Sequence, residues 1–249
     1  MNGIGDAVVR IGPVLAIAIV VLAVVAVLVN GRSGLATDTL VATLRAVVQL
    51  AALAGVLAAV VPYLWASALF VVVMAVAAAW TSARRVRREN AGLVVIARCL
   101  VPVAAPTIAI VIVLALVGVL PAKGIAIIPT AGILLGGAMV TTSLAGRRAV
   151  DELATRHGEV EAALSLGLLP RDARLEICAA ASASALIPGL DQTRAVGLVT
   201  IPGAFVGMVL GGASVWAAAA MQLFVLIALL AVSSIAMLVT VELVAREDL

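Results

Sequence analysis

The sequence predicts an all-α membrane protein, a polytopic bundle of about seven transmembrane helices with one cytoplasmic hairpin. Of its 249 residues, 65% are hydrophobic and only 12% are charged. The mean hydropathy is +1.28. Soluble domains contain about half apolar and about a quarter charged residues, and a soluble core could not hide this much apolar surface from water. We therefore expect a single transmembrane domain over residues 1–249.

Seven apolar segments are long enough to cross the bilayer, since about 20 residues span a hydrocarbon layer of about 30 Å. The first segment has no basic cluster before it and no clear cleavage site, so we interpret it as a span rather than a signal peptide. The predicted spans are 11–29, 42–61, 64–82, 100–119, 126–145, 195–212 and 216–241.

Basic residues predict the orientation of these spans. Four arginines between positions 84 and 88 follow the third span, and Arg147 and Arg148 follow the fifth. The positive-inside rule places both loops in the cytoplasm, with the N-terminus outside and the C-terminus inside. All of the 16 Lys and Arg residues except Arg10 and Lys123 are then cytoplasmic. We expect a multi-pass protein of the inner (plasma) membrane, in which the basic pI reflects this bias and not nucleic-acid binding.

The stretch 146–194 is expected to form a cytoplasmic hairpin. Apolar residues recur near helical spacing over 148–166, with acidic residues opposite them. Gly167 can adopt the left-handed conformation that ends a helix, and Pro170 suits the first turn of the next one. We expect this second helix to end at the Pro188–Gly189 pair.

Glu161, Ala162, Ala163 and Gly167 in this hairpin resemble the EAA-x-x-x-G pattern of ABC permeases, which marks the coupling helix that docks in a cleft of the ATPase. The small Ala side chains allow a helix to enter a groove closely, Glu can pair with a cation, and Gly permits the turn that follows. The alternative interpretation is an ordinary surface hairpin.

Further short strings extend this resemblance from the second to the seventh span. They are Arg45-Ala46, Gln49-Leu50, Ile128-Pro129, Ala131-Gly132, Ala138-Met139, Leu186-Ile187-Pro188, Val196-Gly197-Leu198-Val199, Ile201-Pro202-Gly203 and Gln222. Together they resemble the FetB family, bacterial permeases implicated in iron export with plant relatives tied to aluminium tolerance. The resemblance implies a homodimeric permease with two copies of a separate ATPase, which would bind the ATP and Mg.

Two departures from the family pattern leave the cargo open. Gly137 stands where the family suggests Asn, and Ala204-Phe205 stands where it often has two Met. Asn and Met are plausible metal ligands. The expected cargo is an iron-like metal ion, with a small organic or sugar-like solute as the alternative, and the metal ligands are left unassigned.

No catalytic residue is expected in this chain. The sequence contains no G-x-x-x-x-G-K-[ST] motif, so we expect no ATP or other cofactor here. Cys99 and Cys178 have no neighbouring His or paired Cys and are expected to be inert. The rival classes are an ATP-independent secondary transporter or channel and, less favoured, an intramembrane enzyme.

Polar and sulfur-containing side chains within or beside the spans suggest a substrate pathway, because such groups at bilayer depth usually face a bundle interior. Arg45 and Gln49 share one helix face, and Asp191 and Arg194 have the spacing of an ion pair. Snorkelling, packing and an interfacial ion pair are the structural alternatives. The candidates are Arg45, Gln49, Met139, Asp191, Arg194, Met208 and Gln222.

Overall fold

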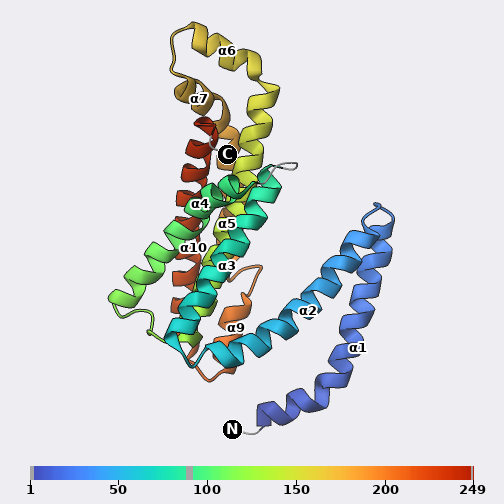
Figure 1. Cartoon of the computed structure of the whole chain (residues 1–249). Coiled ribbons are helices and arrows are strands. Elements are labelled where there is room, and N and C mark those ends of the chain that lie inside the picture. Colours follow the sequence, from blue (N-terminus) through green and yellow to red (C-terminus); the bar gives the residue numbers. More distant parts are fainter. Residues whose placement is uncertain (1–2, 88–91, 248) are drawn as a thin grey trace. The chain divides into compact units, whose positions relative to one another are not determined.

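The computed structural model describes residues 3–87, 92–247 and 249, and it confirms the all-α prediction (Figure 1). These residues form no β-strand; they contain one isolated bridge, between Val196 and Thr200. Among them, seven helical segments are long and apolar enough to cross a membrane. The segments are Val14–Gly31, Ala36–Val60, Leu64–Val86, Leu93–Leu116, Gly124–Thr155, Pro170–Ala195 and Val215–Ala245.

The first compact unit contains α1 (Gly3–Gly31) and α2 (Ala36–Val60), which are joined by a short turn. Gly34 has a φ of +73° in the turn, and the Asn30 side-chain amide donates to Thr39 Oγ1 at 2.9 Å across it. The described side chains of the two spans are exposed or only partly buried within this unit. Its outer surface is mostly apolar, as expected of helices surrounded by lipid or by other membrane helices, with Arg45 and Gln49 among the exposed polar residues.

The second unit, residues 60–249, is built around four long helices. These are α3 (Leu64–Val86), α4 (Leu93–Leu116), α5 (Gly124–Thr155) and α10 (Val215–Ala245). Helix α5 lies at the centre and packs against the other three. Small residues allow these close contacts: a Cβ on Gly146 would lie 2.8 Å from Val86 Cγ2. Packing of small side chains is the usual way in which membrane helices associate.

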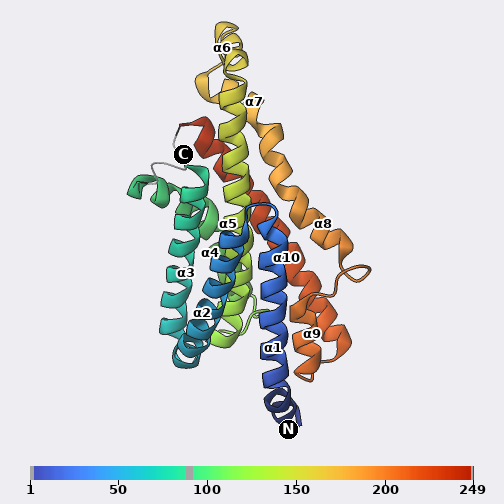
Figure 2. The same cartoon turned by 90° about the vertical axis from the view of Figure 1, so that its right-hand side faces the viewer.

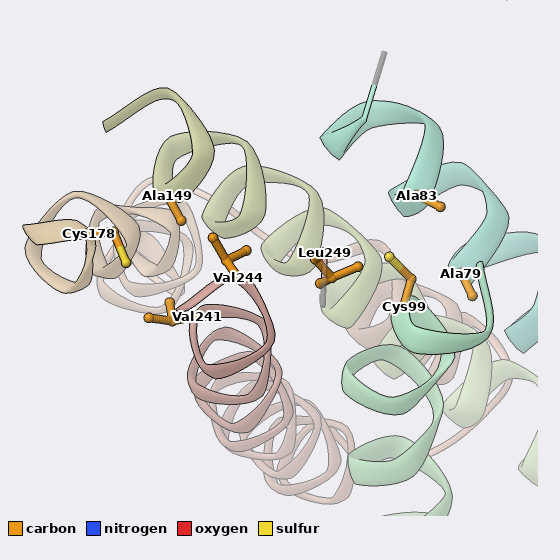
Figure 3. Close-up of a cluster of buried hydrophobic side chains, with 8 residues drawn as sticks. All are labelled: Ala79, Ala83, Cys99, Ala149, Cys178, Val241, Val244 and Leu249. Atoms are coloured by element: carbon orange, nitrogen blue, oxygen red, sulfur yellow. The ribbon is translucent and has the colours of Figure 1, made fainter. Parts of the chain in front are cut away.

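One end of this bundle is held by a cluster of small buried side chains from five helices (Figure 3). Its members are Ala79 and Ala83 of α3, Cys99 of α4, Ala149 of α5, Cys178 of α7 and Val241 and Val244 of α10, together with Leu249. Both cysteines are buried and form no disulfide. Through Cys178 the cluster fastens α7 (Pro170–Ala183) to the bundle.

The predicted single helix over 148–166 is wrong. Helix α5 continues without interruption to Thr155, and a separate short helix α6 (His157–Ser165) follows. Arg156 between them has φ −107° and ψ 31°, which is not helical. Its guanidinium binds Glu152 on one side and Glu159 on the other, which stabilises the corner.

The predicted sixth span, 195–212, is also wrong. The sixth segment long and apolar enough to cross a membrane is Pro170–Ala195, which lies inside the stretch 146–194 that was predicted to be a cytoplasmic hairpin. The helical path that starts with α7 runs through a 3-10 turn, η1 (Ser184–Leu186), into α8 (Ile187–Ala195), so the Pro188–Gly189 pair does not end it. The path breaks at residues 196–202 and resumes as α9 (Gly203–Leu210). An eight-residue helix is about 12 Å long, too short to cross a bilayer.

Local chemistry explains this break. Gly197 has a φ of +80°, which favours glycine. Pro202 lacks an N–H and disfavours helical backbone at Ile201. Figure 2 shows the resulting course, in which α8 leads into a loop and α9 lies beside the first part of α10.

Candidate functional site

Helix α6 carries the predicted coupling residues on its surface. Glu161 and Ala162 are exposed, and Ala163 is partly buried against the cluster of Val160, Ala173 and Ile177. The Glu161 carboxylate lies 3.4 Å from His157 Nδ1. The backbone and one glutamate of α6 are therefore available to a partner, while its inner face is fixed to α7.

Gly167 ends α6 in a Schellman motif, as the sequence predicted. Its φ is +94°. The N–H of Gly167 donates to Leu164 O at 2.9 Å, and the N–H of Leu168 donates to Ala163 O at 3.2 Å. Pro170 then opens α7 at its first position. The turn is thus specified by local residues.

Large apolar side chains gather at this turn, and the sequence analysis missed them. Leu166 is 82% exposed and Leu169 67% exposed, and Leu164 and Leu168 are also exposed. Leucines on both sides of Gly167, in an otherwise polar stretch, were the available signal. An exposed apolar patch on a polar surface is typical of a protein contact.

Two ion pairs fasten α7 to the end of α10. Arg171 binds Glu242 through two hydrogen bonds, at 2.7 Å and 2.6 Å. Arg174 binds the Glu247 carboxylate and also donates to Ala245 O at 3.2 Å. The hairpin is consequently connected to the last long helix as well as to α5.

The corner between α5 and α6 is charged. Arg156 Nε donates to Glu159 Oε1 at 2.6 Å, and its Nη1 donates to Glu152 Oε1 at 3.1 Å. The hydrogen bond from Arg156 holds the pKa of Glu159 below its ordinary value of 4.5. The same two carboxylates raise the pKa of Arg156, so these ion pairs are intact at neutral pH.

A cavity of about 1160 Å³ lies beside α6, at the ends of α3, α5 and α10, and several arginines line it. Arg85, Arg87 and Arg147 line it together with Asp151 and His157. Such a concentration of arginine attracts acidic groups of a partner or anionic lipid.

The predicted pathway residues lie on several different helices. Arg45 and Gln49 are exposed one turn apart on α2, in the first unit. Asp191 and Arg194 form the expected ion pair on α8, at 3.3 Å, with both side chains exposed. In the described residues no group of three or more His, Cys, Asp or Glu is placed to hold a metal ion.

Met139 and Met208 lie on different helices of the second unit, and both are partly buried. The backbone carbonyl of Met139 on α5 accepts from Ser82 Oγ of α3 at 3.2 Å and from Ser143 Oγ at 2.7 Å. Met208 lies on α9. Neither methionine lines the pocket described next.

Gln222 is the pathway candidate with the most specific environment. It lies on α10, is 7% exposed, and its Oε1 has no hydrogen-bond partner in the described part of the chain. The side chain faces a pocket of about 300 Å³ between the 196–202 break, α9 and α10. The other residues that line this pocket are Val196, Gly197, Thr200, Ile201, Pro202, Phe205, Ala219 and Leu223.

The two departures from the family pattern have structural consequences. A Cβ on Gly137 would lie 2.2 Å from Leu229 Cδ1, so glycine here allows α10 to approach α5. Phe205, in contrast, lines the pocket beside Gln222. Neither placement follows from the sequence alone.

Comparison with known proteins gives a consistent result. A family model described as an uncharacterised protein family, UPF0014, matches residues 12–248. The UPF0014 membrane protein STAR2 of Oryza sativa subsp. japonica is 31% identical over 93% of this chain and 80% of its own length. Protein ALUMINUM SENSITIVE 3 of Arabidopsis thaliana is 39% identical over 45% of this chain and 41% of its own.

A bacterial relative also matches over most of the chain. The probable iron export permease protein FetB of Escherichia coli (strain K12) is 28% identical over 91% of this chain and 88% of its own length. No solved structure matches the chain.

Proposed function

The chain belongs to the UPF0014 family of membrane proteins, which confirms the predicted resemblance to the FetB permeases, and from this membership we propose that it is the permease subunit of an ABC exporter. It is a multi-pass membrane protein with seven candidate spans. In this proposal the chain is not itself an enzyme, and ATP and Mg bind to a separate ATPase subunit.

The observation that carries the proposal is the exposed end of the hairpin. Helix α6 presents Glu161 and Ala162, and the leucines at its end, such as Leu166 at 82% exposure, have no cover within the second unit. Apolar side chains outside the bilayer are costly in water, at roughly 25 cal/mol per Å² of exposed apolar area. A cleft in an ATPase would cover them and would receive the glutamate.

The assembly follows from the number of hairpins. One coupling helix per chain and two ATPase subunits per transporter require two copies of this permease. We place α6, the turn at Gly167 and the C-terminus in the cytoplasm, and the N-terminus outside the inner (plasma) membrane, because the arginines beside α6 then obey the positive-inside rule. Closure of the ATPases would move the hairpins and reorient the spans.

The first cargo to consider is a metal ion, iron above others, because the Escherichia coli relative is named a probable iron export permease. A small organic solute is the second, favoured by the largely apolar pocket at Gln222. A second candidate function, ATP-independent secondary transport, is favoured by the broken path of α8 and α9, since such breaks are common in secondary transporters.

Co-purification with a co-expressed ATPase tests the proposal. Leu166→Asp and Glu161→Arg are expected to abolish the complex while the permease remains in the membrane. Leu166→Met and Glu161→Gln, which keep the apolar surface and the side-chain shape, are expected to retain it. Assembly of the charged variants at the wild-type level, or transport without any ATPase, would refute the coupling role.

A further inference from the structure

The break between α8 and α9 has a closed hydrogen-bond pattern of its own. The carbonyl of Ala195 accepts from the N–H groups of Leu198, Val199 and Thr200, at 3.3, 2.9 and 3.1 Å. Gly197 donates back to Thr200 O at 3.0 Å. The loop is therefore a folded turn and holds the wall of the pocket in place.

The first turn of α9 leaves hydrogen-bond donors at the same place. Pro202 precedes this helix and provides no side-chain cap. The first N–H groups of any α-helix lack partners within the helix, and they carry its partial positive charge. These donors lie beside Pro202 and Phe205, which both line the pocket.

Gln222 faces this pocket from the opposite side. It is seven residues from the start of α10, or about 10 Å along the helix. Buried amide groups in proteins are almost always hydrogen-bonded, and lipid cannot supply a partner. Yet Gln222 is 7% exposed and its Oε1 has no partner in the described residues. Oε1 itself is covered in this conformation, although Gln222 lines the pocket, so a ligand gains this acceptor when the side-chain amide turns toward it.

The lining of the pocket indicates what kind of molecule that is. Among the described residues that line it, only Thr200 and Gln222 have polar side chains, and none is charged. Ile201, Phe205 and Leu223 supply apolar surface. A mostly apolar pocket of about 300 Å³ with a few polar groups is typical of a site for a small organic ligand.

We infer that this pocket binds the transported cargo as a small organic molecule with an apolar body and a hydroxyl group. Once the Gln222 amide turns toward the pocket, the hydroxyl donates to its Oε1 and accepts from the first N–H groups of α9. The apolar body packs on Phe205 and Leu223. A bare metal ion requires several oxygen, nitrogen or sulfur ligands, and one amide with one hydroxyl does not provide them. A metal enters this pocket only as a complex with an organic ligand.

The identity of the ligand as cargo rests on the proposed transport function, but binding to the pocket can be tested on the permease alone. We would place a single thiol at the pocket with Ala219→Cys, in a chain with Cys99→Ala and Cys178→Ala. The full-length protein in nanodiscs is treated with N-ethylmaleimide, and the rate of modification is measured. The probes are 2-naphthol and 2-methylnaphthalene, which share their ring system and differ by a hydroxyl in place of a methyl group, and Fe²⁺ alone.

We expect 2-naphthol to slow modification at least fivefold and 2-methylnaphthalene less than twofold, because only the first can pair with the buried amide. Gln222→Leu and Gln222→Met are expected to remove this difference, and Gln192→Leu, on the exposed surface of α8, to leave it unchanged. A wild-type melting temperature shows that each variant is folded.

Three results would overturn the inference. The first is equal protection of the thiol by 2-naphthol and 2-methylnaphthalene, and the second is protection by 2-naphthol that persists in both folded Gln222 variants. The third is protection of the thiol by Fe²⁺ added without any organic ligand. The ATPase is absent from this assay. Protection without any ATPase-dependent transport in a separate assay would therefore retain the site and refute the transporter proposal. ATPase-dependent transport without protection by 2-naphthol would refute the site and retain the transporter proposal.

Discussion

Arg171 at the start of α7 binds Glu242 near the end of α10 with two hydrogen bonds, from Nε to Oε1 at 2.7 Å and from Nη2 to Oε2 at 2.6 Å. Side chains 71 positions apart in the sequence thereby join the hairpin to the last helix. Two parallel hydrogen bonds fix direction as well as distance, so we expect a movement of α7 to be transmitted to α10.

We expect Arg171→Leu and Glu242→Gln each to lower the amount of cargo transported per ATP hydrolysed several-fold, with little loss of folded protein. The pair is partly exposed, and such pairs contribute little to stability because water screens them. Transport per ATP in proteoliposomes is the measurement. The exchange Arg171→Glu with Glu242→Arg should restore part of the coupling, and Asp172→Asn, which removes only the neighbouring partner of Arg171, should preserve it. Normal coupling in the single variants would contradict this role.

The hairpin turn offers a matched pair of glycines. A Cβ added to either Gly158 or Gly167 would meet no atom within 4 Å, but only Gly167 has a left-handed backbone, with φ +94°. Gly167→Ala therefore costs about 1–2 kcal/mol of local strain, while Gly158→Ala does not. We expect co-purification with the ATPase to fall several-fold for the first variant alone. Equal recovery of both complexes would show that the turn geometry is not needed for docking.

The corner at Arg156 predicts a pH dependence. Because the pKa of Glu159 is lowered in the folded protein, its ion pair contributes fully above its ordinary pKa of 4.5 and is lost as pH falls through the lowered value. ATPase binding by the wild type should thus be constant from about pH 8 to 5 in a pull-down titration. Arg156→Gln removes this ion pair at every pH, so its binding should be weaker than that of the wild type above about pH 5. The two curves should converge as pH falls through the lowered Glu159 pKa of the wild type. A titration unchanged by this substitution would exclude the corner as a determinant.

Close packing of α5 predicts a difference between two of its glycines. A Cβ on Gly146 would meet Val86 Cγ2 at 2.8 Å and Thr240 Cγ2 at 3.3 Å, whereas one on Gly136 would meet nothing within 4 Å. Gly146→Ala should lower the melting temperature of the permease in detergent, because β-branched neighbours cannot easily move aside. Gly136→Ala should leave it unchanged or raise it, since alanine favours the helix. Val86→Ala is expected to rescue the Gly146 variant, and failure to do so would place the strain elsewhere.

The orientation of the hairpin can be tested by thiol labelling in a chain without Cys99 and Cys178. Ala122, before α5, and Ala162, on α6, are both exposed and suit cysteine substitution. An impermeant maleimide added to intact cells should label the thiol at position 122 and not the one at 162. Reaction at 162 alone would invert the topology, and reaction at both would show that α5 does not cross the membrane.

Much of this architecture follows from local sequence. Composition and apolar length predict seven spans, because the bilayer requires about 20 apolar residues in every crossing helix. Gly167 and Pro170 mark the hairpin turn, because each residue restricts its own backbone. The i,i+3 pair of Asp191 and Arg194 is also a local relationship. Features of this kind need no knowledge of the rest of the chain.

The tertiary structure decided where the sixth helix is interrupted and what the interruption creates. A hydropathy average includes Gly197 and Pro202 without marking them as helix breakers. The sequence therefore predicted one continuous span over 195–212, where the structure has a break at 196–202. Arg171 and Glu242, or Phe205 and Gln222, share no local pattern. They meet because α7 and α9 both pack against α10, at a distance in sequence over which neither periodicity nor propensity carries information. The sequence by itself thus determined the membrane class and the turn at Gly167. Only the packing of helices produced a buried amide beside a pocket.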